Sequence, residues 1–167
     1  MTPHPIPLVC AIVPAPAPIT QADPDDPAAL YCLGEYFALL AARIPDLSLS
    51  LFPLPDPDAH KYRLPQGAFL IAWGHTTPLG CVSLRPLTRS LGEVKRLWVA
   101  PQARGQGLAR RLMLQIEHTA RSLGYANLNL DTNEHLPEAI TLYQATHWTP
   151  TAAYSGPPST HWFTKRL

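Results

Sequence analysis

Residues 93–109 read EVKRLWVAPQARGQGLA, and this stretch decides the fold. Its first part, from about Gly92 to Val99, is typical of a β-strand, and a helix is predicted to start near Gly107. Glycines at 105 and 107 let the backbone approach an oxyanion closely, and the free N–H groups of a first helical turn point at such a ligand. The junction between strand and helix therefore predicts a phosphate-binding loop.

Three arginines accompany this loop, at positions 104, 110 and 111. The dipole of a helix makes its N-terminus positive, so cations at that end are unfavourable unless an anion lies among them. Solvated arginines around a tight turn are the simpler alternative. The combination of glycines, arginines and a strand-to-helix junction favours an anion site.

Two other phosphate-binding patterns fit this loop less well. A P-loop requires a lysine followed by serine or threonine, whereas Leu108 follows Gly107. A dinucleotide fold would match Gly105 and Gly107, and Asp131 could hold a ribose, but Arg110 occupies the place of the third glycine. A nucleotide-binding oxidoreductase is therefore the less favoured alternative.

The helix after the loop is the clearest predicted element, and Gly124 is placed to end it. Its expected apolar stripe consists of Leu108, Leu112, Ile116, Ala120 and Leu123, with Met113 beside it. A strand, a helix and a second strand in this order predict a parallel strand pair. In chain order we expect a strand at 8–13, a helix at 28–43, strands at 68–73, 80–84 and 92–99, the helix at 107–123, a strand at 125–130, a helix at 137–146 and one or two closing strands after 148. This order predicts one mixed α/β domain over residues 1–167, with 1–7 as an extended arm.

Composition narrows the class of protein further. The chain is 46% hydrophobic and 15% charged, with a net charge of +1, so we expect no general attraction to nucleic acid or to a membrane. Three scattered cysteines, at 10, 32 and 81, indicate reduced thiols in a cytoplasmic protein, and no histidine has metal-ligand spacing. Twenty prolines, many within 3–27 and 45–65, predict extended loops there; a proline-rich ligand segment is the alternative.

The segment 93–99 followed by Gln102-X-X-Gly105-X-Gly107 resembles the acetyl-CoA loop of the GNAT superfamily of N-acetyltransferases. Downstream, 139–143 and then His147-Trp148 are similar to the closing helix and aromatic turn of that family. The residues at 81–87 and 130–132 also resemble a bacterial subgroup of poorly defined substrate. The resemblance covers about 70–167. It implies the GNAT fold, a central, mostly antiparallel sheet with one splayed parallel strand pair, flanked by helices.

The resemblance further implies acetyl-CoA as the co-substrate, with no metal. The cofactor-binding residues that it implies are Leu97, Trp98, Val99, Gln102, Arg104, Gly105, Gln106, Gly107, Leu108 and Ala109. A backbone N–H near Val99 would polarise the thioester carbonyl. Attack by the amine would be direct, in a ternary complex. Cys81 as a covalent nucleophile is the alternative, although a buried structural thiol is commoner.

Two residues are expected to move protons. Glu93 is the candidate base for the attacking ammonium, directly or through water, and its alternative role is an ion pair with Lys95 or Arg96. Tyr143 matches the family position that protonates the leaving thiolate, and its alternative role is to cover the core. Two positions depart from the family pattern. Leu136 stands where many relatives carry an asparagine, with Asn133 too early to replace it, and His147 stands where a glycine of positive φ is common.

The acceptor is expected to be a primary amine of a small molecule or of an amino-acid-like compound. Arg85, Lys95 and Arg96 could bind a carboxylate of such an acceptor, and solvated strand-edge charges are the alternative. A CoA-binding sensor or scaffold without turnover is the second hypothesis. The protein is expected to be a monomer or homodimer.

Overall fold

The computed structural model describes residues 16–167, so the strand expected at 8–13 lies outside the described residues. Within this range, seven strands form one sheet in the order β1-β2-β3-β4-β5-β7-β6. Neighbouring strands are antiparallel except β4 and β5, which are parallel. The predicted mixed α/β class with a mostly antiparallel sheet is confirmed. The strands are β1 Ile19–Gln21, β2 Ala68–Trp73, β3 Pro78–Pro86, β4 Leu91–Val99, β5 Asn127–Thr132, β6 Thr149–Pro150 and β7 His161–Arg166.

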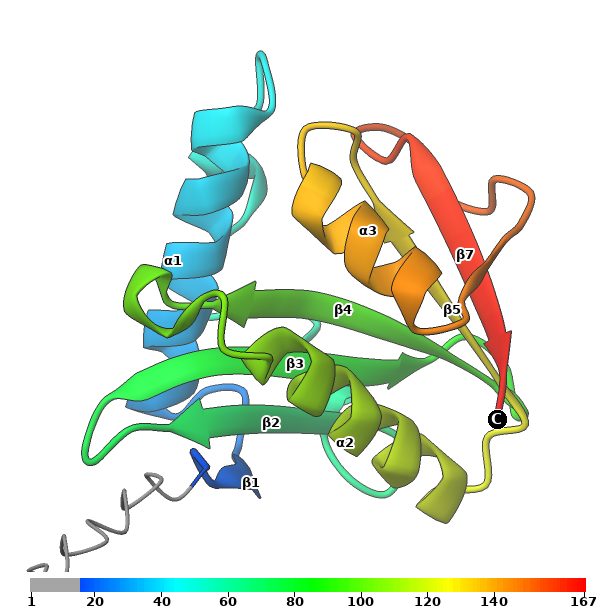
Figure 1. Cartoon of the computed structure of the whole chain (residues 1–167), viewed down its shortest axis with the longest axis horizontal. Coiled ribbons are helices and arrows are strands. Elements are labelled where there is room, and N and C mark those ends of the chain that lie inside the picture. Colours follow the sequence, from blue (N-terminus) through cyan, green and yellow to red (C-terminus); the bar gives the residue numbers. More distant parts are fainter. Residues whose placement is uncertain (1–15) are drawn as a thin grey trace, which may run out of the picture.

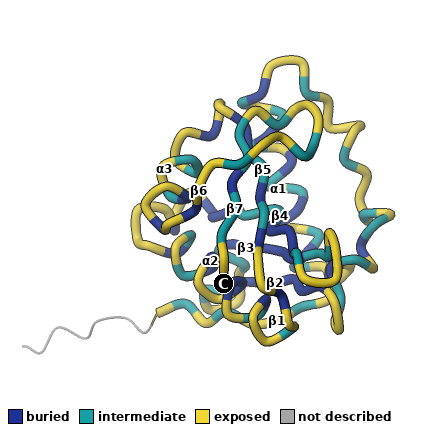
Figure 2. Tube along the Cα trace, turned by 90° about the vertical axis from the view of Figure 1, so that its right-hand side faces the viewer, coloured by how far each residue is buried: buried dark blue, intermediate teal, exposed yellow. Residues whose placement is uncertain are grey.

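Helices cover both faces of this sheet. They are α1 Pro27–Arg43, α2 Leu108–Ser122 and α3 Pro137–Ala145. Figure 1 shows α2 and α3 in front of the sheet and α1 behind it. Successive side chains of a strand point to opposite faces, so Leu70 of β2 joins the hydrophobic cluster of α2, whereas Ile71 joins that of α1. In Figure 2 the buried residues accordingly run along the central strands.

Helix α2 follows the amphipathic pattern that the sequence predicts. Its buried apolar residues are Leu108, Leu112, Met113, Ile116 and Ala120, and Leu123 beyond its end is half-buried. Glu117 is buried as well, because Lys165 and the indole N–H of Trp148 donate hydrogen bonds to its carboxylate. Gly124 ends this region with a φ of 91°, a conformation that favours glycine.

Strands β4 and β5 separate after only three paired positions. The last pair is Glu93 with Asn129, and beyond it β4 stays on β3 while β5 stays on β7. The divergence is plain in Figure 1, where β5 rises steeply away from β4. A bulge in β4 lies in the same place, and Arg96 there has a φ of 60°. The predicted splayed parallel pair is confirmed, and it leaves one edge of β4 without a strand partner.

The proline-rich segment 45–66 is less extended than we expected from its composition. It contains two short 3₁₀ turns, at Leu49–Leu51 and Ala59–Tyr62. Ion pairs hold it in place, since its Asp56 contacts Arg96 of β4 and its Arg63 lies 2.7 Å from Asp23, just before α1. The segment is therefore attached by ion pairs both to β4 and to the residues just before α1.

Candidate active site

A cavity of about 360 Å³ lies where β4, the loop after it and the N-terminus of α2 meet. Eight of the ten predicted cofactor-binding residues line it: Leu97, Trp98, Val99, Arg104, Gly105, Gly107, Leu108 and Ala109. Helices α1 and α3 close its other side through Tyr36, Leu39, Leu136, Glu138, Ala139 and Leu142. The structure thus brings the sequence-predicted loop to an apolar cleft of the size of a small-molecule site.

Two glycines give the loop its shape. Gly105 and Gly107 have φ values of 72° and 77°, and a β-carbon at either would meet no other atom within 4 Å. Their requirement for glycine is therefore conformational rather than steric. The N–H of Arg111, which bonds to the carbonyl of Gly107, is the first one after the loop to donate within the described chain. The N–H groups of 105–110 remain available to an anion, as expected for a helix N-terminus.

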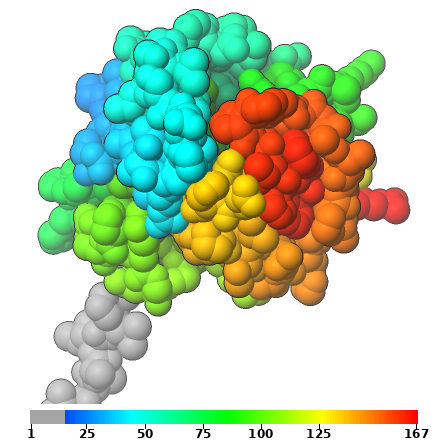
Figure 3. Space-filling view, turned by 90° about the horizontal axis from the view of Figure 1, so that it is seen from above, coloured from blue at the N-terminus to red at the C-terminus, as the bar shows by residue number. Residues whose placement is uncertain are grey.

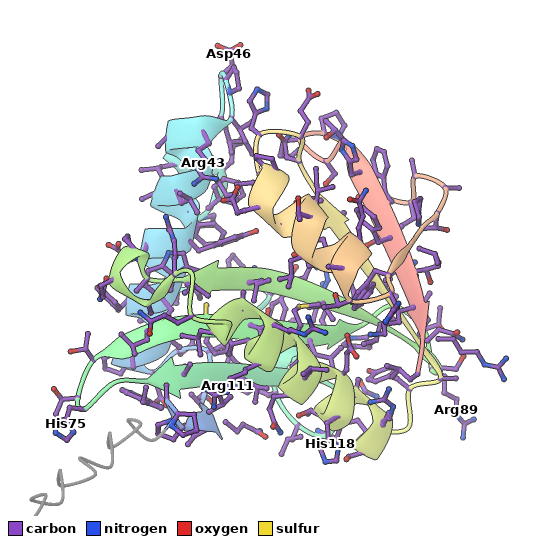
Figure 4. The ribbon with its side chains drawn as sticks, viewed as in Figure 1. Arg43, Asp46, His75, Arg89, Arg111 and His118 are labelled. Atoms are coloured by element: carbon purple, nitrogen blue, oxygen red, sulfur yellow. The ribbon has the colours of Figure 1, made fainter. Side chains whose placement is uncertain are left out.

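The three arginines near the loop have different surroundings. Arg104 and Arg110 line the cavity, and Arg104 Nε donates to the carbonyl of Val99 over 3.0 Å. Arg111 instead donates to the carbonyl of Ala17 over 2.7 Å, on the side of α2 that faces β1 (Figure 4). Two of the three arginines, Arg104 and Arg110, are therefore placed to contact an anion in this cavity.

Gln102 and Gln106 do not line the cavity. They contact each other, with Gln106 Nε2 donating to the carbonyl of Gln102 over 3.2 Å. Their cofactor-binding role remains a prediction, and in the structure they brace the loop.

A second, smaller cavity of about 40 Å³ lies in the gap between β4 and β5. The bulged residues of β4 line one side, and Asp131, Leu136 and Tyr143 line the other. No hydrogen bond joins the Tyr143 hydroxyl to another residue within 16–167, although its ring packs against Trp148 and Phe163. Burial raises the pKa of Tyr143, so its phenol stays protonated at neutral pH. A protonated, unengaged phenol beside the strand gap fits the predicted acid.

The turn after α3 takes the conformation expected for it. His147 has a φ of 66°, which confirms that this position needs the left-handed region. Leu136, which replaces the asparagine common in relatives, lines the two cavities above and also a third one, which Arg85, Lys95 and Arg96 border. Asn133 is engaged elsewhere, since its amide donates to the carbonyl of Pro158.

Glu93 lies at the point where the strands part, but it is buried and lines none of these cavities. Arg85 donates to its Oε2 over 2.5 Å, and the hydroxyl of Tyr154 donates to Oε1 over 3.1 Å. Lys95 Nζ lies 3.6 Å from the same Oε1. Of the two ion-pair partners predicted as its alternative role, Lys95 is present and Arg96 is not, and Arg85 is the nearer partner; the role as a base remains a prediction.

A third cavity, of about 350 Å³, opens on the far side of the strand gap. All three predicted substrate residues, Arg85, Lys95 and Arg96, line it. Aromatic and aliphatic side chains of α1 and of the segment after it form the opposite wall: Tyr36, Phe37, Leu40, Ile44 and Phe52. Figure 3 shows the C-terminal end of α1, the start of α3 and the segment around 155–159 close together on this side of the molecule.

Asp131 is a site residue that sequence reasoning did not identify for this role. It lines both the small cavity and the third cavity. Lys95 donates to its Oδ1 over 2.6 Å, and the hydroxyls of Ser155 and Ser159 donate to Oδ2 over 2.7 and 2.8 Å. Burial alone would raise the pKa of Asp131, but Lys95 and the serine hydroxyls outweigh it and hold the pKa below its ordinary value. A carboxylate is therefore present at the junction of the two cavities.

Three aromatic residues contact the side chains around the third cavity without lining it themselves. Tyr62 packs on Arg96, Tyr154 binds Glu93, and Trp162 donates to Ser155. Cys81, the alternative nucleophile, is fully buried away from the cavities, and burial raises the pKa of its thiol, which makes it a poor nucleophile.

No group of three or more His, Cys, Asp or Glu side chains within residues 16–167 has the arrangement of a metal site. None of the helices in the same range has the length and apolar character needed to cross a membrane.

Comparison with known proteins agrees with this geometry. The chain belongs to the Acetyltransferase (GNAT) family, whose sequence model matches residues 38–148, more than half of the chain. An uncharacterized N-acetyltransferase of Schizosaccharomyces pombe is 38% identical over 96 residues, 56% of this chain and 59% of the relative. An IAA acetyltransferase of Azospirillum brasilense is 38% identical over 88 residues, 52% of this chain and 58% of the relative. The chain thus spans about three fifths of the length of these curated relatives.

Solved structures show the same fold. An acetyltransferase of the GNAT family from Staphylococcus aureus has a TM-score of 0.76 at 14% identity, over 90% of this chain and 99% of that one. An aminoglycoside 6'-N-acetyltransferase complexed with coenzyme A has a TM-score of 0.67 at 14% identity, over 89% and 96%. At such low identity these likenesses concern the fold alone.

Proposed function

We propose that this protein transfers the acetyl group of acetyl-CoA to a primary amine of a small molecule, by direct attack within a ternary complex. One observation carries the proposal: the gap between β4 and β5 joins a glycine loop on one side to a charged cavity on the other, with Tyr143 in between. A donor and an acceptor entering from opposite sides would meet at this gap. Membership of the GNAT family supports the reaction class.

The first cavity suits acetyl-CoA on chemical grounds. The unengaged N–H groups of 105–110 would hold the pyrophosphate, with Arg104 and Arg110 beside it. The edge of β4 that β5 leaves unpaired would bond the amide groups of the pantetheine arm. A backbone N–H of this edge, near Val99, would polarise the thioester carbonyl.

The proposed step forms a C–N bond and breaks the C–S bond of the thioester. The ammonium of the acceptor loses two protons: Glu93 is the proposed base for the first, which is then released to solvent, and the second, lost as the C–N bond forms, replaces the proton that Tyr143 is proposed to donate to the leaving thiolate. Because Arg85 and Tyr154 already bind Glu93, the proton would reach it through water. No covalent intermediate on the protein is needed.

The third cavity is the proposed acceptor site. The cytoplasm is the proposed location of the protein, because its cysteines suggested reduced thiols. Thermal unfolding tests the donor half of the proposal. Acetyl-CoA should raise the melting temperature, because a ligand that binds only the folded state stabilises it, whereas NAD and ATP should not. Stabilisation by NAD and not by acetyl-CoA would refute the proposal.

A further inference from the structure

The charges that face the third cavity are unbalanced. Among the described residues that line it, Arg85, Lys95 and Arg96 are cationic, and Asp131 carries the one carboxylate. The carboxylates that pair with Arg85 and Arg96, those of Glu93 and Asp56, do not line the cavity. A carboxylate in this cavity could therefore contact the cationic side chains directly, whereas their partners Glu93 and Asp56 lie behind them.

Arg96 is the residue of this wall that is best placed for recognition. Its guanidinium lies 4.4 Å from the ring centre of Tyr62 and 5.6 Å from that of Phe37, so it is held between the 45–66 segment and α1. Its Nη2 donates to Asp56. Its Nη1 is buried and has no hydrogen-bond partner within residues 16–167. A buried guanidinium N–H without an acceptor is unfavourable, so an acceptor atom supplied by a ligand would be bound strongly.

We propose that the acceptor carries both an amine and a carboxylate, and that Arg96 binds the carboxylate while Asp131 holds the ammonium. This inference rests on the proposed function, because it names the acceptor class of the same site. Asp131 suits the ammonium because it lines both the acceptor cavity and the small cavity beside Tyr143. The remaining wall, which includes Phe37, Phe52 and Ile44, suits an apolar side chain. The acceptor class is thus an amino acid with an apolar or aromatic side chain.

A purely structural role for Arg96 makes different predictions. If Arg96 only anchored the 45–66 segment through Asp56, then removing either partner would have the same effect. If Arg96 binds a carboxylate, then Arg96→Met removes the recognition, whereas Asp56→Asn leaves the guanidinium free to act. The preference for a carboxylate over a carboxamide separates these cases, because general damage to the cavity weakens both ligands alike.

The experiment measures binding to the CoA-loaded full chain by calorimetry. The probes are matched sets such as phenylalanine, phenylalaninamide and phenethylamine, and the same sets built on leucine and tryptophan. We expect the amino acid to bind about tenfold tighter than its carboxamide or its decarboxylated amine, as one charge-assisted hydrogen bond allows. Arg96→Met should abolish that preference, Arg96→Lys should restore part of it, and Asp56→Asn should keep it. Arg63→Gln is the matched control, because Arg63 also pairs with aspartates but lies outside this cavity, and it should change nothing.

Three results would overturn the inference: equal binding of all three members of each set, no binding of any amino acid, or equal loss of preference in Arg96→Met and Asp56→Asn. Release of CoA thiol in the same mixtures is scored separately. A carboxylate preference without thiol release would leave this inference standing and count against the proposed function. Thiol release with only carboxylate-free amines would support the proposed function and count against this inference.

Discussion

Lys95 donates a hydrogen bond to Asp131 over 2.6 Å, and this ion pair joins β4 to β5 two residues beyond their last paired position, Glu93 and Asn129. The backbones have already separated there, so side chains alone connect the two strands. The pair therefore bridges the gap between β4 and β5, in which the reaction is proposed to occur. It also keeps a carboxylate where the small cavity meets the proposed acceptor cavity.

Asp131→Asn should raise the KM for the amine at least tenfold, because the neutral amide no longer attracts an ammonium. The affinity for acetyl-CoA should change less than threefold, since Asp131 does not line the first cavity. Stability should fall by about 1–3 kcal/mol, because Lys95 loses its closest anionic partner. Steady-state kinetics with acetyl-CoA titration checks this. Asp58→Asn, which breaks the exposed pair of Asp58 with Lys61, is the control and should leave all three quantities unchanged.

Three glycine-to-alanine substitutions distinguish an effect on acetyl-CoA binding by the loop from a general effect on folding stability. Gly107→Ala should cost about 1 kcal/mol of stability from left-handed strain and weaken acetyl-CoA binding about tenfold. Gly124→Ala carries the same strain at the other end of α2, so it should lower stability alone. Gly34→Ala, within α1 and with open space around it, should stabilise the protein by about 0.5–1 kcal/mol. Equal acetyl-CoA affinity in the first two variants would show that the loop does not bind the cofactor.

Tyr143→Phe should lower kcat by about 100-fold or more, because general acid catalysis contributes about 10²- to 10⁴-fold. The melting temperature should hardly change, because the hydroxyl makes no hydrogen bond within the described residues and the ring contacts persist. Stopped assays with acetyl-CoA and unfolding by denaturant measure the two quantities. A variant as active as the native protein over the whole pH range would remove Tyr143 from the mechanism.

The buried tyrosines should destabilise the protein at alkaline pH, starting above about pH 10. Burial raises the pKa values of Tyr36, Tyr143 and Tyr154, so the folded state keeps phenolic protons that the unfolded state loses above its ordinary pKa of about 10. Each such phenol removes up to about 1.4 kcal/mol of stability per pH unit between the two pKa values, and below pH 10 it has no effect. Urea unfolding at pH 8, 10 and 11 tests this. Tyr143→Phe should show a smaller decline from pH 10 to 11 than the native protein.

The sequence predicted the fold well where a local pattern dictates it. The stripe of α2 and the glycines at 105 and 107 act through helical periodicity and backbone conformation, which depend on neighbouring residues only. Strand β1 was missed because Ile19–Gln21 is short and follows a proline-rich stretch, so that only its pairing with β2 makes it a strand.

The site was less predictable because it depends on the register between distant strands. The position of Asp131 opposite Lys95 follows from where β4 and β5 part, and no local pattern reveals that point. A polar residue between the buried Leu130 and Thr132 was the only available signal. The same holds for Asp56, whose contact with Arg96 spans 40 residues of sequence.

An ion pair between α1 and α3 likewise depends on how the chain folds and not on a local sequence pattern. Arg43, labelled near the end of α1 in Figure 4, pairs with Glu138 in the first turn of α3, and Glu138 lines the first cavity. Both side chains retain solvent contact, so the pair should contribute less than about 1 kcal/mol.

The most direct test of the central claim is the appearance of an N-acetylated product. Purified protein is incubated with acetyl-CoA and a panel of primary amines that includes amino acids, and mass spectrometry follows the product while a thiol reagent follows released CoA. We predict equal amounts of N-acetylated amine and free CoA for at least one amine, and about tenfold slower formation of both with Gly107→Ala when acetyl-CoA is well below saturation. Tight binding of acetyl-CoA without any acetylated amine across the panel would contradict this prediction and would identify the protein as a CoA-binding sensor.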